Sequence, residues 1–298
     1  MSYHNAVLLQ ESVKGLNINP SGVYVDVTFG GGGHSKEILK HLNQNGKLFA
    51  FDQDKDALQN NINDDRFLLI NENFRYLKRF LRFNGVQKVD GILADLGVSS
   101  HQFDVPERGF STRYVANLDM RMNASDELSA YKVINTYEEK ELKKMFFEYG
   151  ELKNAGAIAN KITEARKIKE IKTTEDFKSV VAKFLPPHKT KKILAQMYQA
   201  IRIEVNSEIE ALKEFLLQSL EVLNTNGRLS VISYHSLEDR LVKRFMRNGM
   251  FEGEPERDIY GRFEVPFTII EKLIIPSEKE IEENNRARSA KLRVAEKN

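Results

Sequence analysis

The sequence of 298 residues contains no cysteine. Disulfides, thiolate zinc sites and cysteine nucleophiles are therefore excluded, and we expect no resident metal. The chain also lacks any run approaching the roughly 18 apolar residues that cross a bilayer. Its first stretch, MSYHNAVLLQESVKGL, has no basic region, apolar core or small-residue cleavage site of the kind found in secretory signals. These absences predict a cytoplasmic protein with no membrane partner.

The net charge is only +2, but it is unevenly distributed along the chain. Between Lys132 and Glu204, 16 lysines and arginines accompany 10 acidic residues, which gives +6 and leaves −4 for the remainder. A basic middle within a mildly acidic frame predicts that one region contacts a polyanion. A solvated helical surface would produce the same pattern, so charge alone leaves both interpretations open.

Strand-like and helix-like segments alternate at both ends of the chain. Short apolar segments bounded by turn residues predict strands, at 23–29, 47–52, 67–73, 89–96, 228–234, 267–275 and 291–297. Helical patterns separate them, as in HSKEILKHL, FRYLKRFLRF and the amphipathic run that precedes Asn226-Gly227. Buried strands separated by helices predict an α/β fold whose mostly parallel sheet is covered on both faces.

The middle of the chain shows helical patterns and no convincing strand. One helix is predicted by an apolar stripe at i, i+3, i+4 and i+7: Leu142, Met145, Phe146 and Tyr149. Thr136 and Glu139 have the spacing of a capping box at its start. A second helix is expected to end at residues 186–187, both proline, and a third to cover 191–205.

We therefore expect a sheet domain in two parts, residues 1–107 and 207–298. Between them, residues 108–206 form a helical insert. Because the insert contains the basic region, it is the part of the chain expected to contact a polyanion, if there is one.

The stretch YVDVTFGGGGHSKEIL, residues 24–39, joins a strand to a helix through four glycines. A P-loop would need a lysine that is missing here. The G-x-G-x-x-G dinucleotide pattern is also not matched, because its third glycine is missing. Asp26 followed by Gly30 to Gly33 instead suits S-adenosylmethionine, because glycine lets the backbone approach the methionine part and a carboxylate can bind its ammonium. A glycine turn shaped only for packing is the alternative.

Two further residues extend this prediction to adenosine. Asp52 ends the second strand 20 residues after Gly32, the spacing at which a carboxylate accepts both ribose hydroxyls in nucleotide folds. Phe74, just after the third strand, is placed to stack on adenine, although an ordinary core aromatic would have the same spacing.

Asp95 ends the wholly apolar fourth strand, at the edge where parallel sheets bind ligands. A surface turn residue is the alternative. The segment VISYHSLEDR ends the next strand, so its polar residues are predicted to face Asp95: Ser233, His235, Ser236, Asp239 and Arg240. A lone histidine is more often structural than catalytic, yet so dense a cluster makes His235 a second catalytic candidate beside Asp95.

Longer segments give the chain a specific resemblance. It resembles the bacterial ribosomal RNA small subunit methyltransferase H family, whose members methylate N4 of one cytidine in 16S ribosomal RNA. The matching segments occur in consistent order between residues 4 and 297: HNAVLLQE, YVDVTFGGGGHS, FDQD, VDGILADLGVSSHQFD, RGFS, LDMRM, QAIRIEVNSE, SYHSLEDRLVKRFM and NNRARSAKLRVAEK. The chain departs from the family at Tyr234, where phenylalanine is frequent.

The resemblance implies a class I methyltransferase fold with a helical insert and S-adenosylmethionine as cofactor. It implies cofactor contacts at seven residues: Gly32, Gly33, His34, Asp52, Phe74, Asp95 and Gln102. It further implies 16S ribosomal RNA within the small ribosomal subunit as the macromolecular partner, with the modified cytidine in the decoding region. The basic insert, residues 108–206, is then expected to recognise this RNA. A homodimer is kept as a hypothesis.

Cytosine N4 is a weak nucleophile because its lone pair is delocalised into the ring. The enzyme must hold that nitrogen in line with the methyl group, and Asp95 is the first candidate to accept its amino hydrogens. Methylation at carbon 5 would need a cysteine adduct, which this chain cannot form. Tyr234 is a candidate to stack on the base, with core packing as the alternative. The rival function is a non-catalytic RNA-binding assembly factor, which would not bind S-adenosylmethionine.

Overall fold

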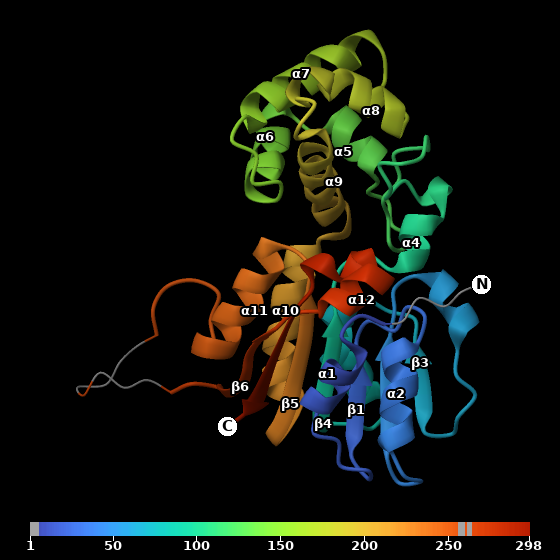
Figure 1. Ribbon diagram of the computed structural model, residues 1–298, viewed down its shortest axis with the longest axis vertical. Helices are drawn as coiled ribbons and strands as arrows, with labels where there is room; N and C mark the ends of the chain where they lie inside the picture. The colour runs from blue at the N-terminus through green and yellow to red at the C-terminus, as the bar shows by residue number, and fades with distance from the viewer. Residues whose placement is uncertain (1–5, 256–259, 261–263) are drawn as a thin grey trace. The chain divides into compact units, whose positions relative to one another are not determined.

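The computed structural model describes residues 6–255, 260 and 264–298 (Figure 1). The chain divides into two compact units, one formed by residues 1–97 with 209–298 and the other by residues 98–208. His4 and Asn5, which open the first motif of the family resemblance, lie outside the described residues. None of the helices in the described ranges combines the length and the hydropathy that crossing a bilayer requires.

The first unit is built on a seven-stranded sheet in the order β3-β2-β1-β4-β5-β7-β6. The strands are β1 Val23–Asp26, β2 Lys47–Phe51, β3 Phe67–Ile70, β4 Val89–Asp95, β5 Leu223–Ser233, β6 Phe267–Ile274 and β7 Lys291–Lys297. The pairs within β3-β2-β1-β4-β5 are parallel, whereas β7 runs antiparallel to both β5 and β6. All seven predicted strands and the mostly parallel α/β fold are confirmed.

Helices cover both faces of this sheet because the strand residues alternate between them. Val25 belongs to an apolar cluster with Leu77, Leu212 and Val242, whereas its neighbour Tyr24 belongs to another cluster with Val13 and Ile38. The helical segments of the unit are α1 Leu9–Gly15, α2 Gly33–His41, η1 Lys55–Asn60, η2 Phe74–Tyr76, α3 Leu77–Phe83, α10 Glu208–Val222, α11 Ser236–Asn248, α12 Glu278–Glu283 and η5 Asn285–Ser289. Burial of apolar side chains on both faces explains why the central strands are almost continuously hydrophobic.

The second unit is helical and has its own apolar core. Its segments are α4 Ser100–Asp104, η3 Pro106–Arg108, α5 Ala130–Thr136, α6 Glu139–Glu148, α7 Ala155–Ile168, α8 Thr174–Val181, η4 Ala182–Phe184 and α9 Thr190–Asn206. Leu142, Met145 and Phe146 of the predicted stripe are all buried in this core. The unit begins at residue 98 rather than 108, because Val98 and Phe103 also pack against the helical core.

The predicted capping box of Thr136 and Glu139 is wrong. Thr136 is the last residue of α5, where its hydroxyl donates to the carbonyl of Lys132. Helix α6 instead begins with a capping box between Glu138 and Glu141. Because α5 extends through Thr136, that residue cannot be the N-cap of the next helix.

Candidate active site at the carboxyl edge of the sheet

The carboxyl ends of the parallel strands bring three carboxylates to one edge of the sheet. Asp26 ends β1, Asp52 follows β2 and Asp95 ends β4, as the strand pattern predicted. Strand β5 pairs with β4 in parallel, with Ile232 opposite Asp95, so the residues after β5 reach the same edge. This is the edge at which open α/β sheets bind ligands.

The glycine turn at this edge uses its glycines for different reasons. Gly30 and Gly32 have φ values of +49° and +75°, a left-handed conformation that side chains disfavour. A Cβ at Gly32 would lie 2.9 Å from the Phe29 ring, and one at Gly33 would lie 2.9 Å from Cβ of Ala6. A Cβ at Gly30 would meet nothing within 4 Å, so the turn has open space beside Gly30.

Asp26 is fully buried, and its carboxylate is used inside the protein. One oxygen accepts a hydrogen bond of 2.6 Å from the Ser35 hydroxyl, and the other accepts from the Thr28 backbone N–H at 3.1 Å. Burial raises the pKa of Asp26, against the opposing effects of His34, Ser35 and Thr28. The expectation that Asp26 binds the ammonium of a ligand directly is therefore wrong, because its oxygens are not accessible.

Asp52 is only partly buried and is held by the backbone around it. Its two oxygens accept from the N–H groups of Gly30 and Asp54, both at 2.8 Å. Burial raises the pKa of Asp52 to about 6, helped by the charges of Asp54 and Asp26, although the two backbone bonds oppose it. Since a carboxylate offers about four lone-pair sites, Asp52 can still accept two hydroxyl groups.

Phe74 is the first residue of η2 and is half-buried. Its ring packs edge-on against Phe215 of α10, with ring centroids 5.4 Å apart. Phe74 thus packs in the core and is also partly exposed. The two interpretations, a core aromatic and a residue that stacks on adenine, therefore do not exclude each other.

Asp95 is fixed at the end of β4 by two neighbours. Its backbone N–H donates to the Thr28 hydroxyl at 2.6 Å, and its Oδ1 accepts from the Tyr234 hydroxyl at 2.7 Å. Burial raises the pKa of Asp95 to about 6; His34 and Tyr234 oppose this rise, and the charges of Asp26 and Glu238 add to it. The Asp95 side chain nevertheless keeps 23% of its surface exposed, so it can accept a ligand hydrogen.

His34 links the glycine turn to Asp95. It is buried on α2, and its Nε2 lies 3.1 Å from the Val7 carbonyl. A carbonyl can only accept, so Nε2 carries the hydrogen and Nδ1 is directed to Asp95, whose Oδ2 is 3.9 Å away.

The segment after β5 forms the start of α11. His235 is the N-cap of α11 and forms a capping box with the buried Glu238. Asp239 does not face Asp95 as predicted, because its oxygens bind Arg293 at 2.7 Å and Lys291 at 3.2 Å. Both partners belong to β7, whose antiparallel return was not part of that prediction.

Sequence reasoning missed two residues of this edge, and one residue that it assigned to the cofactor lies in the other unit. Thr28 and the hydroxyl of Tyr234 were not assigned to Asp95, although Thr28 lies two residues after β1 and Tyr234 directly follows β5. Gln102 belongs to the other unit, where it completes the capping box of α4 with Ser99. Its predicted cofactor contact stays a prediction.

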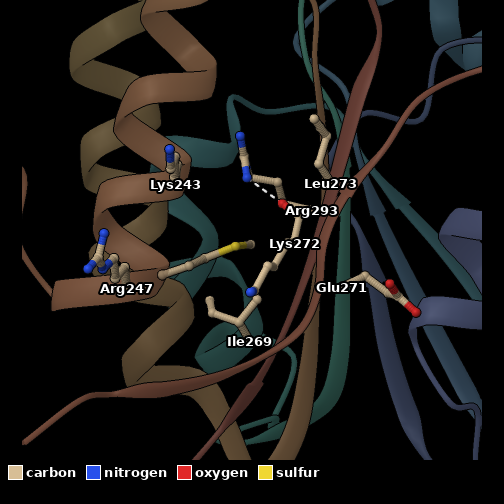
Figure 2. Close-up of a pocket in the computed structure, with 8 residues that line it drawn as sticks. Lys243, Arg247, Ile269, Glu271, Lys272, Leu273 and Arg293 are labelled. Carbon is tan, nitrogen blue, oxygen red and sulfur yellow. Dashed lines mark hydrogen bonds between the residues drawn. The ribbon is translucent and has the colours of Figure 1, made fainter.

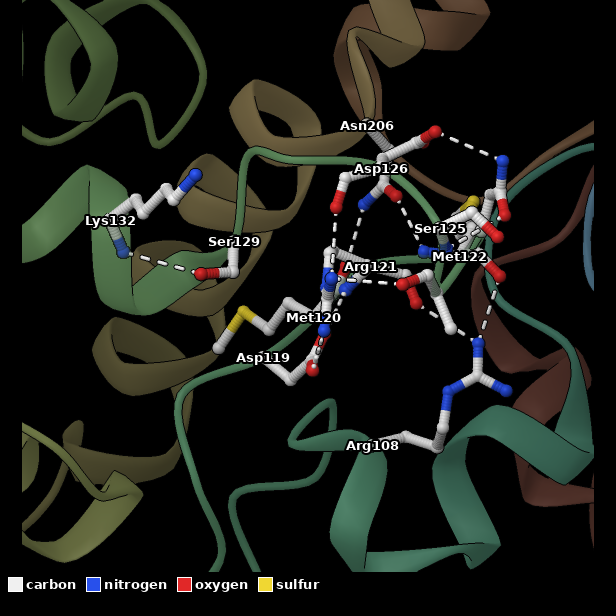
Figure 3. Close-up of polar contacts among 12 residues, drawn as sticks. Arg108, Asp119, Met120, Arg121, Met122, Ser125, Asp126, Ser129, Lys132 and Asn206 are labelled. Carbon is white, nitrogen blue, oxygen red and sulfur yellow. Dashed lines mark hydrogen bonds and ion pairs between the residues drawn. The ribbon is translucent and has the colours of Figure 1, made fainter.

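Two further motifs of the family resemblance meet inside the helical unit (Figure 3). In LDMRM, Met120 is fully buried with φ of +58°, a strained conformation for a side chain. Asn206 of α9 holds this strained backbone, since it accepts from the Met122 N–H at 2.7 Å and donates to the Met120 carbonyl at 2.8 Å. Arg121 binds both oxygens of Asp119, at 2.9 and 2.7 Å. These contacts join the two motifs within the helical unit.

The fold and the site together define the class of protein. The sheet order with an antiparallel β7, the glycine turn and the acid after β2 define a class I S-adenosylmethionine-dependent methyltransferase. The model of the MraW methylase family matches residues 1–298, and the chain belongs to that family.

Two relatives are each named ribosomal RNA small subunit methyltransferase H. The one from Flavobacterium johnsoniae is 68% identical over 297 residues, covering 100% of this chain and 98% of the relative. The one from Flavobacterium psychrophilum is 70% identical over 290 residues, covering 97% of this chain and 100% of the relative. A solved structure described as a putative rRNA-methylase from Clostridium thermocellum aligns over 100% of both chains with 14% identity and a TM-score of 0.45.

Proposed function

We propose that this protein transfers a methyl group from S-adenosylmethionine to N4 of one cytidine in the decoding region of 16S ribosomal RNA, within the small ribosomal subunit. Family membership and the names of the relatives support the reaction class and the RNA. The observation that carries the chemistry is the partly exposed Asp95 carboxylate, fixed by Tyr234 at the ligand-binding edge of the sheet.

The residues at this edge fit the cofactor. The backbone beside Gly30 borders open space, and Asp52 is oriented by two backbone donors while retaining free lone pairs. Asp52 would bind the ribose hydroxyls, Phe74 would contact the adenine, and Gly32, Gly33 and His34 would line the rest. When bound, S-adenosylmethionine supplies an electrophilic methyl group and leaves as S-adenosylhomocysteine.

Asp95 orients the nucleophile in this proposal. Its ionised carboxylate accepts the amino hydrogens of the cytosine, which favours a localised lone pair on N4 and holds that nitrogen for transfer. No base stronger than a carboxylate is needed, because the amino proton can leave after the methyl group has arrived. His235 caps α11 beside this edge and remains the second catalytic candidate.

The decisive experiment incubates the purified protein with labelled S-adenosylmethionine and small ribosomal subunits that lack the modification. We expect label at a single cytidine, identified as N4-methylcytidine by mass spectrometry. Calorimetry with S-adenosylmethionine separates this proposal from a non-catalytic assembly factor. Absence of both binding and transfer would favour the assembly factor.

Recognition of RNA by the helical unit forms a second part of the proposal. Lys189, Lys191 and Lys192 are all exposed at the start of α9. Replacing the three by alanine should weaken RNA binding, and the log–log salt slope should fall by roughly 0.7–0.9 for every phosphate that is no longer bound. Cofactor affinity should not change. An unaltered slope would show that this corner does not touch RNA.

A further inference from the structure

A hollow of about 610 Å³ lies between α11 and the β6–β7 edge of the sheet (Figure 2). We call it the α11–β6 hollow. Lys243 and Arg247 line it from α11, and Lys272 lines it from β6. Met246, Ile269 and Leu273 supply apolar surface between these cations. Its volume lies in the range of small-molecule and cofactor sites, roughly 300–1,000 Å³.

The charges of the α11–β6 hollow are mostly uncompensated. Lys243, Arg247 and Lys272 are exposed, and no carboxylate of another described residue forms an ion pair with any of them. Arg293 also lines the hollow but is engaged by Asp239 and by the Lys272 carbonyl. Glu271 is the one acidic lining residue, and Figure 2 shows its side chain directed away from the cations. The hollow is thus a cationic surface with an apolar floor.

The α11–β6 hollow lies in the same unit as the ligand-binding edge of the sheet and close to that edge. Lys291, the first residue of β7, pairs with Ser233, the last residue of β5, and Arg293 is only two residues further on. Arg293 therefore lies about 7 Å along β7 from Lys291 at this edge. Helix α11 also begins at this edge, so Lys243 and Arg247 lie roughly 10 and 16 Å along it.

We infer that the α11–β6 hollow binds phosphodiester groups of the substrate RNA next to the methylated nucleotide. Lysine and arginine are the usual partners of backbone phosphates, and they fix the position of a nucleic acid without reading its sequence. The apolar floor can accept the face of a sugar or base beside those phosphates. Cations spread over a helix and a strand suit successive phosphates of a chain better than one isolated phosphate. The inference rests on the proposed RNA substrate, and it adds a contact surface that lies outside the helical unit.

The test uses the full-length double variant Lys243→Ala/Arg247→Ala. Its binding to a labelled single-stranded RNA carrying the target cytidine and its flanks is measured by anisotropy at several salt concentrations. Without these two phosphate-binding side chains, the log–log slope should become shallower by roughly 1.5. In methylation of unmodified small subunits, KM should rise about tenfold while kcat is retained, which is the signature of weaker uniform binding. The affinity for S-adenosylmethionine and the melting temperature should be unchanged.

The matched control is Arg79→Ala/Arg82→Ala, which removes the same charge from exposed positions of α3 in the same unit. This control should retain the slope and the KM. An unchanged slope in the α11 variant, or an equal loss in the control, would overturn the inference. Failure of the unmodified protein to methylate subunits would refute the proposed function instead, and the salt slope would still decide whether the hollow binds RNA.

Discussion

Asp52 and Asp95 of the sheet unit are held in a different way from Asp119 of the helical unit. In the sheet unit, Asp52 and Asp95 accept hydrogen bonds from backbone N–H groups and a tyrosine hydroxyl, and the pKa of each is raised to about 6. In the helical unit, burial alone would raise the pKa of Asp119, but hydrogen bonds from Arg121 outweigh it and keep that pKa below its usual value.

This difference separates carboxylates that bind ligands from carboxylates that stabilise the fold. An arginine that occupies both oxygens of a carboxylate leaves little room for a ligand. Neutral donors keep a carboxylate oriented yet able to accept further hydrogens, although its charge is then incompletely compensated. The charges of Asp52 and Asp95 are thus poorly compensated within the protein, whereas the charge of Asp119 is compensated by Arg121.

The sharpest way to separate the two kinds of carboxylate is Asp95→Asn. Turnover should fall on the order of 1,000-fold, the upper range for losing one preorganised polar contact, because an amide is a weaker acceptor for the amino hydrogens. The melting temperature should change little. Single-turnover methyl transfer measures the effect, with the exposed Asp65→Asn as control. Full activity would remove Asp95 from the mechanism.

Replacing a polar residue that stabilises the fold should instead lower stability and leave ligand binding intact. Asn206→Ala should reduce the free energy of unfolding by about 3 kcal/mol, because it removes the buried hydrogen bonds of Asn206 to the Met122 N–H and the Met120 carbonyl. Urea denaturation measures this reduction, and the exposed Asn154→Ala in the same unit serves as control. Binding of S-adenosylmethionine should persist. A variant with unaltered stability would show that the strained Met120 backbone needs no such support.

The role of Asp52 predicts an effect on binding rather than on folding. Asp52→Ala should weaken the affinity for S-adenosylmethionine by about 2 kcal/mol, the scale of hydrogen bonds to a charged group. In the unmodified protein, affinity should decline as the pH falls below about 6, since the Asp52 carboxylate becomes protonated there. Calorimetry at pH 5 and pH 7.5 measures both effects. If Asp52→Ala binds as tightly as the original chain, the adenosine lies elsewhere.

The smallest expected effect belongs to Tyr234→Phe. The Tyr234 hydroxyl stabilises the ionised form of Asp95, so its removal should raise the pKa of Asp95 further. Because transfer needs the carboxylate, the acidic limb of the rate profile should move to higher pH, by about one unit for one charge-assisted hydrogen bond. The pH dependence of kcat measures this shift. An unmoved limb together with a uniform fall in rate would indicate that Tyr234 only packs.

Much of this architecture could be predicted from local sequence. Apolar runs bounded by turn residues located all seven strands, and strand ends located Asp52 and Asp95. The side-chain partners of Asp95 and Asp239 could not be predicted, because they lie on segments distant in sequence. The hydrogen bond between Tyr234 and Asp95 spans 139 residues, and the contact of Asp239 with Arg293 exists only because β7 returns antiparallel to β5.

Accessibility was also beyond a sequence pattern. Asp26 and Asp52 occupy similar positions at the ends of neighbouring strands, yet Asp26 is fully buried and Asp52 is not. Asp26 accepts a hydrogen bond from the Ser35 side chain of α2, whereas Asp52 accepts from the backbone N–H groups of Gly30 and Asp54.

The pairing of β4 with β5 has a consequence for how the chain is made. The strands are adjacent in space, but Asp90 and its hydrogen-bond partner Asn224 are separated by 134 residues. At a synthesis rate of roughly 5–20 residues per second, β4 emerges from the ribosome about 7–27 s before its partner does. During that interval the apolar strand is an unpaired edge, which can pair with another chain. Early folding of residues 98–208 would shorten the effective loop and so lower the entropic cost of bringing β5 to β4 once β5 has emerged.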